Sequence, residues 1–290
     1  MTLRREQPQV GSCWYDNVLA SRPRIRCSSE SNHLLHLRVE STMSINVKYI
    51  YSACIVTKTD NIRILHDPWF TEGIYDGSWF HFPKVDDPIK SIGDVDLIYI
   101  SHIHPDHYDP KFLKKYFEVY GTKKILIADH KPNYLAGKMR LDGFQYQIVS
   151  TSICFGKTSI EIMPHKTGSI SDIDSAIVVK YDDGSRIHCI VNANDIIFNN
   201  DSRLTLKKMA GDVDILLLGH TGAGPYPQTY FEVTDDDLVV EAQKKKLAFF
   251  ERYKNLISVI NAKVNIPFAG KYLLGGKLTN LNEFRGTADP

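Results

Sequence analysis

Residues 101–109 gather side chains that can bind metal ions. The run contains His102, His104, Asp106 and His107, so three imidazoles and a carboxylate lie within six residues. In an extended segment His102 and His104 point the same way, because side chains alternate along the chain. Their ring nitrogens can bind one metal ion at about 2.0–2.1 Å, and Asp106 and His107 on the following turn can serve a second ion. A solvated histidine-rich loop is the alternative, and it does not explain such density directly after an apolar strand.

The segments on either side of this run would position it. Residues 95–100 form a continuous apolar strand, which delivers the chain to the edge of a sheet, where a loop can turn side chains inward. Asp109 and Pro110 form a helix start, with a capping carboxylate followed by proline at the first helical position. Residues 112–120 then follow helical spacing.

The rest of the chain predicts about ten strands in two batches, with helices between and after them. This mixture favours an α+β protein, an αβ/βα sandwich of two mixed β-sheets flanked by helices. A long aromatic loop is expected over residues 67–88. The other predicted strands are residues 45–49, 53–57, 62–65, 124–128, 145–149, 159–163, 175–181, 187–191 and 213–218, and the other predicted helices are residues 132–141, 202–210 and 234–262.

The first 42 residues differ from the remainder. They are rich in Arg, Ser, Gln and Asn and show no sustained period, whereas an orderly pattern opens at Met43. We expect residues 1–42 to be a poorly ordered extension, or translation to start at Met43. Residues 43–290 then form the folded domain, whose natural C-terminal end is expected to extend further.

Composition excludes several classes of protein. Among 290 residues, Lys and Arg total 35 and Asp and Glu total 34, so the basic excess typical of nucleic-acid-binding proteins is missing and no nucleic acid is expected as a partner. The apolar runs are strand-sized, which predicts no transmembrane segment. The five cysteines are scattered, without a Cys-x-x-Cys pair. They predict reduced, buried thiols in a cytoplasmic protein.

The spacing His-x-His-x-Asp-His resembles the metallo-β-lactamase superfamily, and the likeness extends over residues 43–270. The candidate ligands that follow this run along the chain occur in the order expected for that family. The resemblance implies that His165 is the third ligand of the first metal ion, and that Asp195 bridges the two ions. The family usually completes the second site with a late histidine, for which His220 is the candidate. The rival interpretation places His220 near the substrate, within a glycine-rich loop over residues 219–224.

In the scheme that this resemblance implies, a hydroxide held between two divalent ions about 3.5–4 Å apart attacks the substrate. His102, His104 and His165 would bind one ion. Asp106, His107 and His220 would bind the other, and Asp106 would also relay a proton as the catalytic residue. Zinc is the default cofactor, whereas a nitrogen and oxygen ligand set also admits iron or manganese.

Shorter pieces of the sequence narrow the resemblance. Residues 67–69, 171–175 and 267–270 look like the metallo-β-lactamase-type part of CMP-N-acetylneuraminate hydroxylases. Residues 222–227 look similar to that group and to N-acylphosphatidylethanolamine phospholipase D, with a weaker likeness to ascorbate-6-phosphate lactonases. The chain has no Cys-x-His pair of a Rieske module, and no histidine follows Gly224. Both are departures from those relatives.

The aromatic loop and the glycine-rich loop are the candidate walls of a substrate pocket. Trp69, His81 and Trp79 in the first loop, and Gly222 and Ala223 in the second, are candidates to contact a small-molecule substrate. The alternative for the three residues of the aromatic loop is that they pack within the fold.

Three functions are compatible with the sequence. The leading hypothesis is a binuclear metal-dependent hydrolase acting on a phosphodiester, ester, lactone or amide bond, in a sugar-like substrate. The second is an iron-dependent redox enzyme, or the metal subunit of an oxygenase related to the hydroxylases. The third is a non-catalytic metal-binding protein. The sequence does not specify the substrate or the oligomeric state.

Overall fold

Two six-stranded sheets pack face to face. The computed structural model describes residues 26–28, 36–38, 45–170, 172–270 and 272–288. The first sheet has the order β3 (Asn46–Tyr51), β4 (Cys54–Lys58), β5 (Arg63–His66), β7 (Leu97–Tyr99), β8 (Lys124–Ala128) and β9 (Tyr146–Val149). The second has the order β10 (Ile153–Phe155), β11 (Thr158–Pro164), β12 (Ser175–Asp182), β13 (Ile187–Asn192), β14 (Ile215–Gly219) and β15 (Val264–Phe268).

Both sheets change from antiparallel to parallel pairing along their width. In the first sheet β3, β4 and β5 pair antiparallel, and β5, β7, β8 and β9 pair parallel. In the second, β10 to β13 pair antiparallel, and β13, β14 and β15 pair parallel. Parallel strands end at a common edge, so the segments that follow β5 and β7, and likewise β13 and β14, emerge together. The candidate metal ligands follow several of these strands.

The inner parallel strands β7, β8 and β14 are buried on both faces, which explains their continuous apolar runs. Leu97 and Tyr99 face the core between the two sheets, whereas Ile98 and Ile100 face the helices outside. The two faces of one strand thus contribute to two separate cores, as the side-chain period of two requires.

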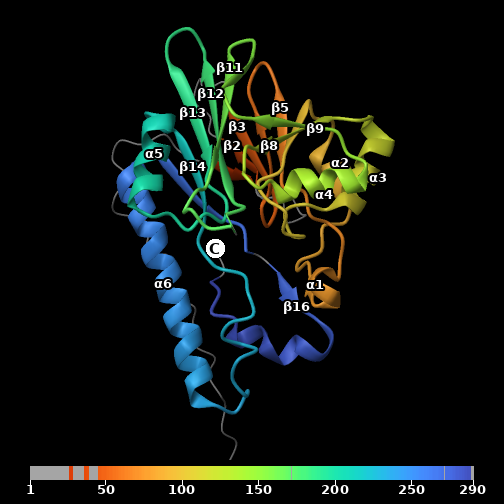
Figure 1. Ribbon diagram of the computed structural model, residues 1–290, viewed down its shortest axis with the longest axis vertical. Helices are drawn as coiled ribbons and strands as arrows, with labels where there is room; N and C mark the ends of the chain where they lie inside the picture. Colours follow the sequence, from red (N-terminus) through yellow and green to blue (C-terminus); the bar gives the residue numbers. More distant parts are fainter. Residues whose placement is uncertain (1–25, 29–35, 39–44, 171, 271, 289–290) are drawn as a thin grey trace, which may run out of the picture.

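Helices cover the outer face of each sheet. In Figure 1, α2 (Pro88–Ile92), α3 (Pro110–Tyr120) and α4 (Tyr134–Asp142) lie on one side, and α5 (Asn200–Ala210) and α6 (Asp236–Ile260) on the other. Phe112 and Leu113 pack on the first sheet, and Leu206 and Leu256 on the second. The predicted αβ/βα sandwich is confirmed.

The start of α3 also fixes the loop that follows β5. Asp109 caps the helix by accepting a hydrogen bond from the Phe112 N–H at 2.9 Å, and Pro110 takes the first helical position as predicted. Its carboxylate also accepts hydrogen bonds from the backbone N–H groups of Phe70 at 3.0 Å and Thr71 at 2.7 Å. One buried carboxylate therefore holds two segments that border the metal-ligand run.

The structure contains elements that the sequence pattern did not predict. The expected loop over residues 67–88 holds α1 (Ile74–Gly77) and β6 (Trp79–Phe80), and α2 begins at Asp87 and Pro88, the same signal as at α3. Further along lie β16 (Leu273–Leu274), which pairs with β6, and η1 (Gly276–Phe284). Pro267 sits inside β15, where proline is tolerated because β15 is an edge strand.

The prediction that the cysteines are buried is wrong for Cys154. Cys54 and Cys189 are buried, but Cys154 is exposed on the edge strand β10. Its neighbours Ile153 and Phe155 pack against the core between the sheets, so alternation turns the cysteine outward.

The predictions for residues 1–42 and Met43 fall mostly outside the described residues. Within them, β1 (Arg26–Ser28) pairs antiparallel with β2 (His36–Arg38). No helix in the described part of the chain is both long and apolar enough to cross a membrane.

Because His66 at the end of β5 is buried, we expect the fold to lose stability in acid. It is fully buried and links both sheets: its Nε2 lies 3.0 Å from Thr57 Oγ1, and its Nδ1 accepts from Asn192 Nδ2 at 3.3 Å. Burial lowers its pKa from 6.5 to about 3. The unfolded chain therefore binds a proton that the fold excludes, so stability falls between pH 6.5 and about 3, by up to about 5 kcal/mol.

Urea unfolding of metal-free protein at several pH values measures this effect. His66→Gln should destabilise the fold at pH 7, and the difference from the wild type should shrink as pH falls. A difference that stays constant with pH would contradict the assignment.

Candidate metal centre and cavity

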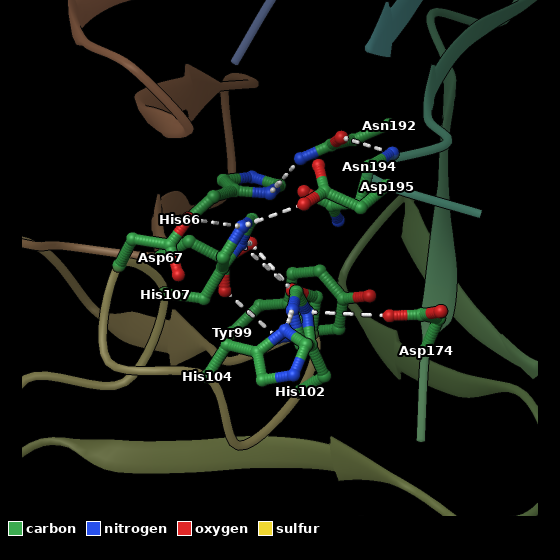
Figure 2. A network of polar contacts seen from close by, with 12 residues as sticks. His66, Asp67, Tyr99, His102, His104, His107, Asp174, Asn192, Asn194 and Asp195 are labelled. Atoms are coloured by element: carbon green, nitrogen blue, oxygen red, sulfur yellow. Dashed lines mark hydrogen bonds and ion pairs between the residues drawn. The ribbon is translucent and has the colours of Figure 1, made fainter. Parts of the chain in front are cut away.

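The segments after β5, β7 and β13 bring the predicted ligands together (Figure 2). Ser101 and His102 follow β7 almost directly, and Asp67 follows β5. After β13 the chain turns through Asn194, whose φ is 47° and whose N–H donates to Asn192 Oδ1 at 3.1 Å. This turn presents Asp195 toward the histidines.

Five of the seven predicted ligands form one cluster. Ligand atoms of His102, His107 and Asp195 all lie within 4.8 Å of one another. His102 Nε2 lies 2.9 Å from His104 Nδ1. His107 Nε2 lies 3.2 Å from Asp195 Oδ2 and 3.6 Å from Asp106 Oδ2. Imidazole nitrogens and carboxylate oxygens that converge in this way are a donor set for divalent metal ions.

His165 and His220 stand outside the close set of His102, His107 and Asp195. His165 follows β11, as expected; its backbone N–H donates to the Asp174 carbonyl at 2.8 Å, and its buried Nδ1 has no hydrogen-bond partner within the described chain. A buried imidazole nitrogen of this kind suits a ligand role. His220 follows β14, and its Nε2 donates to the Ala288 carbonyl at 3.2 Å. The ligand roles of both residues stay predictions.

Asp174 is a carboxylate at this centre that the sequence reasoning did not assign. It lies in the segment before β12, and its Oδ1 is 3.7 Å from His102 Nδ1. Burial raises its pKa to about 6, and the nearby Asp195 carboxylate adds to the rise. A carboxylate next to the second ring nitrogen of a ligand histidine is a common support for metal binding. Residues 171–175 were singled out only for their likeness to hydroxylases.

Asp67 supports the cluster through its contacts with Ser101 and His107. Its buried carboxylate accepts hydrogen bonds from Ser101 N and Ser101 Oγ, both at 2.7 Å, and lies 3.1 Å from His107 Nδ1. Burial raises the pKa of Asp67, and the interactions with His107 and Ser101 oppose that rise. Because Nδ1 donates to Asp67, the His107 Nε2 lone pair is directed at Asp106 and Asp195 when the ring is neutral.

Charges in the cluster favour a cation. Burial opposes protonation of His107, but the carboxylates of Asp195 and Asp106 raise its pKa well above the ordinary value. The pKa of Asp195 is lowered, because the charge of His107 outweighs the effect of burial. Burial and the neighbouring histidines lower the pKa of His102, so this ring is neutral and ready to bind metal. The residues present therefore fit a metal centre, and metal must displace the proton of His107.

Tyr75 contacts the cluster from a strained backbone. Its hydroxyl donates to Asp106 Oδ1 at 2.6 Å. Tyr75 and Asp76 have φ values of 50° and 57°, in the left-handed region that costs L-residues about 1–2 kcal/mol each. Burial and the Asp106 carboxylate raise the pKa of Tyr75, so the hydroxyl stays protonated as a donor. Strain of this kind often marks a functional position.

Tyr75→Phe is expected to lower the kcat of the reaction that this centre catalyses by about 10- to 100-fold, with little change in KM. The reason is that a hydrogen bond to a charged group contributes about 1.5–3 kcal/mol. Tyr108→Phe is the matched control, since the Tyr108 hydroxyl donates to the Asp142 carboxylate at 2.8 Å on the α3–α4 side. Steady-state kinetics and metal content of both variants test this. Equal kcat for the wild type and Tyr75→Phe would contradict a role for the hydroxyl.

A cavity of about 710 Å³ opens beside the cluster. His104, Asp106, Asp174 and Asp195 lie at its metal end. Of the candidate substrate-contacting residues, Trp79, Gly222 and Ala223 line it. A Cβ atom at Gly222 would lie 2.0 Å from Phe249 Cζ, so glycine is required for the loop to approach α6.

Trp69 and His81, in contrast, are absent from the described lining of this cavity. Trp69 is 1% exposed and donates from Nε1 to the Thr71 carbonyl at 2.7 Å. The two rings are 4.2 Å apart in an aromatic cluster, and His81 lies between the Trp69 carbonyl and Glu72. The aromatic loop folds on itself, and Trp79 is the tryptophan that it contributes to the cavity.

Comparison with known proteins identifies the family and the fold of the chain. The family model described as a β-lactamase superfamily domain matches residues 46–269. Among curated proteins, a putative Rieske 2Fe-2S iron–sulfur protein of Mycolicibacterium smegmatis is 28% identical over 238 residues, covering 77% of this chain and 43% of that protein. Cytidine monophosphate-N-acetylneuraminic acid hydroxylase of Cricetulus griseus is 25% identical over 242 residues, covering 79% of this chain and 40% of the hydroxylase. The chain thus spans less than half the length of these relatives.

Solved structures share the fold at low sequence identity. CmlA, a diiron β-hydroxylase from Streptomyces venezuelae, has a TM-score of 0.55 at 13% identity, covering 86% of this chain and 48% of CmlA. An isothiocyanate hydrolase from Delia radicum gut bacteria has a TM-score of 0.50 at 15% identity, covering 78% of this chain and 98% of the hydrolase. Both hydrolases and hydroxylases therefore occur on this architecture. Since the family model spans more than half of its residues, the chain belongs to the β-lactamase superfamily and has the metallo-β-lactamase fold.

Proposed function

We propose that this chain is a metal-dependent hydrolase with a binuclear centre. The observation that supports it is the convergence of His102, His104 and His107 with Asp106 and Asp195 at one end of a large cavity. His102 and His104, with His165 as the predicted third ligand, would hold one ion. Asp106 and His107, with His220 as a further candidate, would hold the other, and Asp195 would lie between them.

When bound, two divalent ions would lower the pKa of a water molecule from roughly 16 to about 7 and polarise the bond to be cleaved. Residues of the chain would transfer the proton and orient the ligands. Asp106, held by the Tyr75 hydroxyl, would accept and relay a proton. Asp67 would keep the His107 ring oriented. The proposed bond is a phosphodiester, ester, lactone or amide, and zinc is the proposed metal.

Reconstitution with a single metal tests this function. Metal-free protein is loaded with Zn²⁺, Mn²⁺ or Fe²⁺, and metals per chain are counted by elemental mass spectrometry. Each form is assayed with bis(4-nitrophenyl) phosphate, 4-nitrophenyl butyrate and γ-thiobutyrolactone. About two ions per chain and turnover in the zinc form support the hydrolase. Full metal loading without turnover of any probe would count against it.

A second candidate is an iron-dependent oxygenase, which the named iron–sulfur and hydroxylase relatives favour. In that case the chain would act with an electron donor, because no Cys-x-His pair of a Rieske module is present in the sequence. Oxygen consumption by the Fe²⁺ form with a chemical reductant supports this candidate. Zinc-dependent hydrolysis without oxygen consumption contradicts it.

A further inference from the structure

We infer that the cavity binds an amphiphilic organic anion, with its charged head group held by Arg203 and Arg252 and its apolar body against α6. The inference rests on the proposed function for the position of the reacting bond, which would lie near Asp195. It names the substrate class and differs from the sugar-like substrate that the sequence suggested.

The walls of the cavity are largely apolar. The lining includes residues of α6, of the segment that follows Asp195 and of η1. Polar side chains, among them Thr221, Gln228 and Asn255, line other parts of the cavity. An alkyl or aromatic body is matched by the apolar side chains, which include Ile197, Phe198, Phe249, Tyr253, Leu256 and Leu278.

The size of the cavity fits a small organic molecule. Its volume of about 710 Å³ lies within the roughly 300–1,000 Å³ of ligand pockets. One wall depends on the close contact between the Gly222 backbone and the Phe249 ring. This contact leaves no room for a side chain at position 222, so the position of the ring depends on this glycine.

Charge selects the head group. The lining carboxylates Asp106, Asp174 and Asp195 all lie at the metal cluster, where divalent cations would offset them. Arg203 and Arg252 also line the cavity, and no described carboxylate lies within ion-pair distance of either guanidinium. A cavity lined by two arginines that have no carboxylate partner among the described residues therefore favours an anion.

Both arginines are held in place. The Arg252 guanidinium carbon lies 4.8 Å from the centroid of the Phe249 ring, in a cation–π contact. Arg203, in the first turn of α5, donates to the Asn200 side chain. Positioned guanidinium groups of this kind suit a carboxylate or a phosphate, which they bind through paired N–H groups.

Calorimetric titration of the zinc-loaded protein with decanoate, decyl phosphate and the uncharged decanamide tests the inference. The bound zinc ions offset the cluster carboxylates, and the arginine variants distinguish binding by the guanidinium groups from coordination of the head group by zinc. We expect decanoate or decyl phosphate to bind about 10- to 100-fold more tightly than decanamide. The stronger of the two anions identifies the head group.

Variants separate the contributions of charge and walls. Arg252→Gln and Arg203→Gln should each reduce the preference for the anion, whereas Arg140→Gln on α4, which is exposed, should not. Phe249→Ala should weaken binding of all three probes, and Gly222→Val should do the same by displacing the ring. Equal binding of anion and amide, an unchanged preference in both arginine variants, or no binding of any probe would overturn the inference. Binding of the anions, together with full metal loading and no turnover of any hydrolysis probe, would remove the proposed hydrolase function and leave this inference standing.

Discussion

Replacing Asp195 by asparagine is expected to reduce bound divalent metal from about two ions per chain to one or fewer. The carboxylate lies 3.2 Å from His107 Nε2 and belongs to the close set with His102. An amide has nearly the same shape but no negative charge, so it cannot offset two cations. Because bound metal stabilises the transition state by several kcal/mol, hydrolysis should fall by at least about 10²- to 10³-fold.

Asp212→Asn provides the matched control. Asp212 is exposed in the turn after α5, and the change removes the same charge. Elemental mass spectrometry and turnover of the probe hydrolysed best would be compared for the two variants and the wild type. If Asp195→Asn kept two ions and full turnover, the cluster in Figure 2 would not be the reaction centre.

Asp67→Asn is expected to weaken both the fold and metal binding. Asp67 is 0% exposed, and its carboxylate accepts two hydrogen bonds from Ser101 and interacts with His107. An asparagine would place an NH₂ group toward one of these donors. Breaking a buried charged interaction of this kind costs about 3–5 kcal/mol of unfolding free energy. Loss of the support for His107 should lower metal affinity by about 10- to 100-fold.

Asp96→Asn isolates the effect of burial. The Asp96 carboxylate also accepts a backbone hydrogen bond, from Arg63 N at 2.7 Å, but it is exposed. The Asp96→Asn variant should lose no more than about 1 kcal/mol of unfolding free energy and should retain its metal affinity. Urea unfolding and competition with a coloured chelator give the two quantities. An Asp67→Asn protein as stable and as tight-binding as Asp96→Asn would contradict the supporting role.

Local signals in the sequence were sufficient to predict the fold class and part of the candidate site. The run from His102 to His107 is dense enough to be recognised alone, and the apolar segment before it becomes β7, as predicted. Asp195 and His165 were placed by family order, and both follow strands as expected. The continuous apolar run over residues 95–100 and the helical spacing over residues 112–120 predicted the elements that carry the site.

The remaining features depend on contacts between distant segments. Tyr75 reaches Asp106 because the aromatic loop turns back through two residues with positive φ, and tyrosine carries no signal for such a turn. Trp69 and His81 were assigned to the substrate, but the same folding back buries both in one aromatic cluster. Asp174 meets His102 only because β12 and β7 lie in different sheets that pack together.

The long helix α6 implies that catalysis and selectivity can evolve separately. Its last turns pack on the second sheet through Leu256 and Ile260, while Phe249 and Arg252 face the cavity. The metal ligands come from strand ends and contribute nothing to this wall. Substitutions along one face of α6 can therefore accumulate without disturbing the reaction centre. A library restricted to that face would be an economical starting point for engineering new specificities.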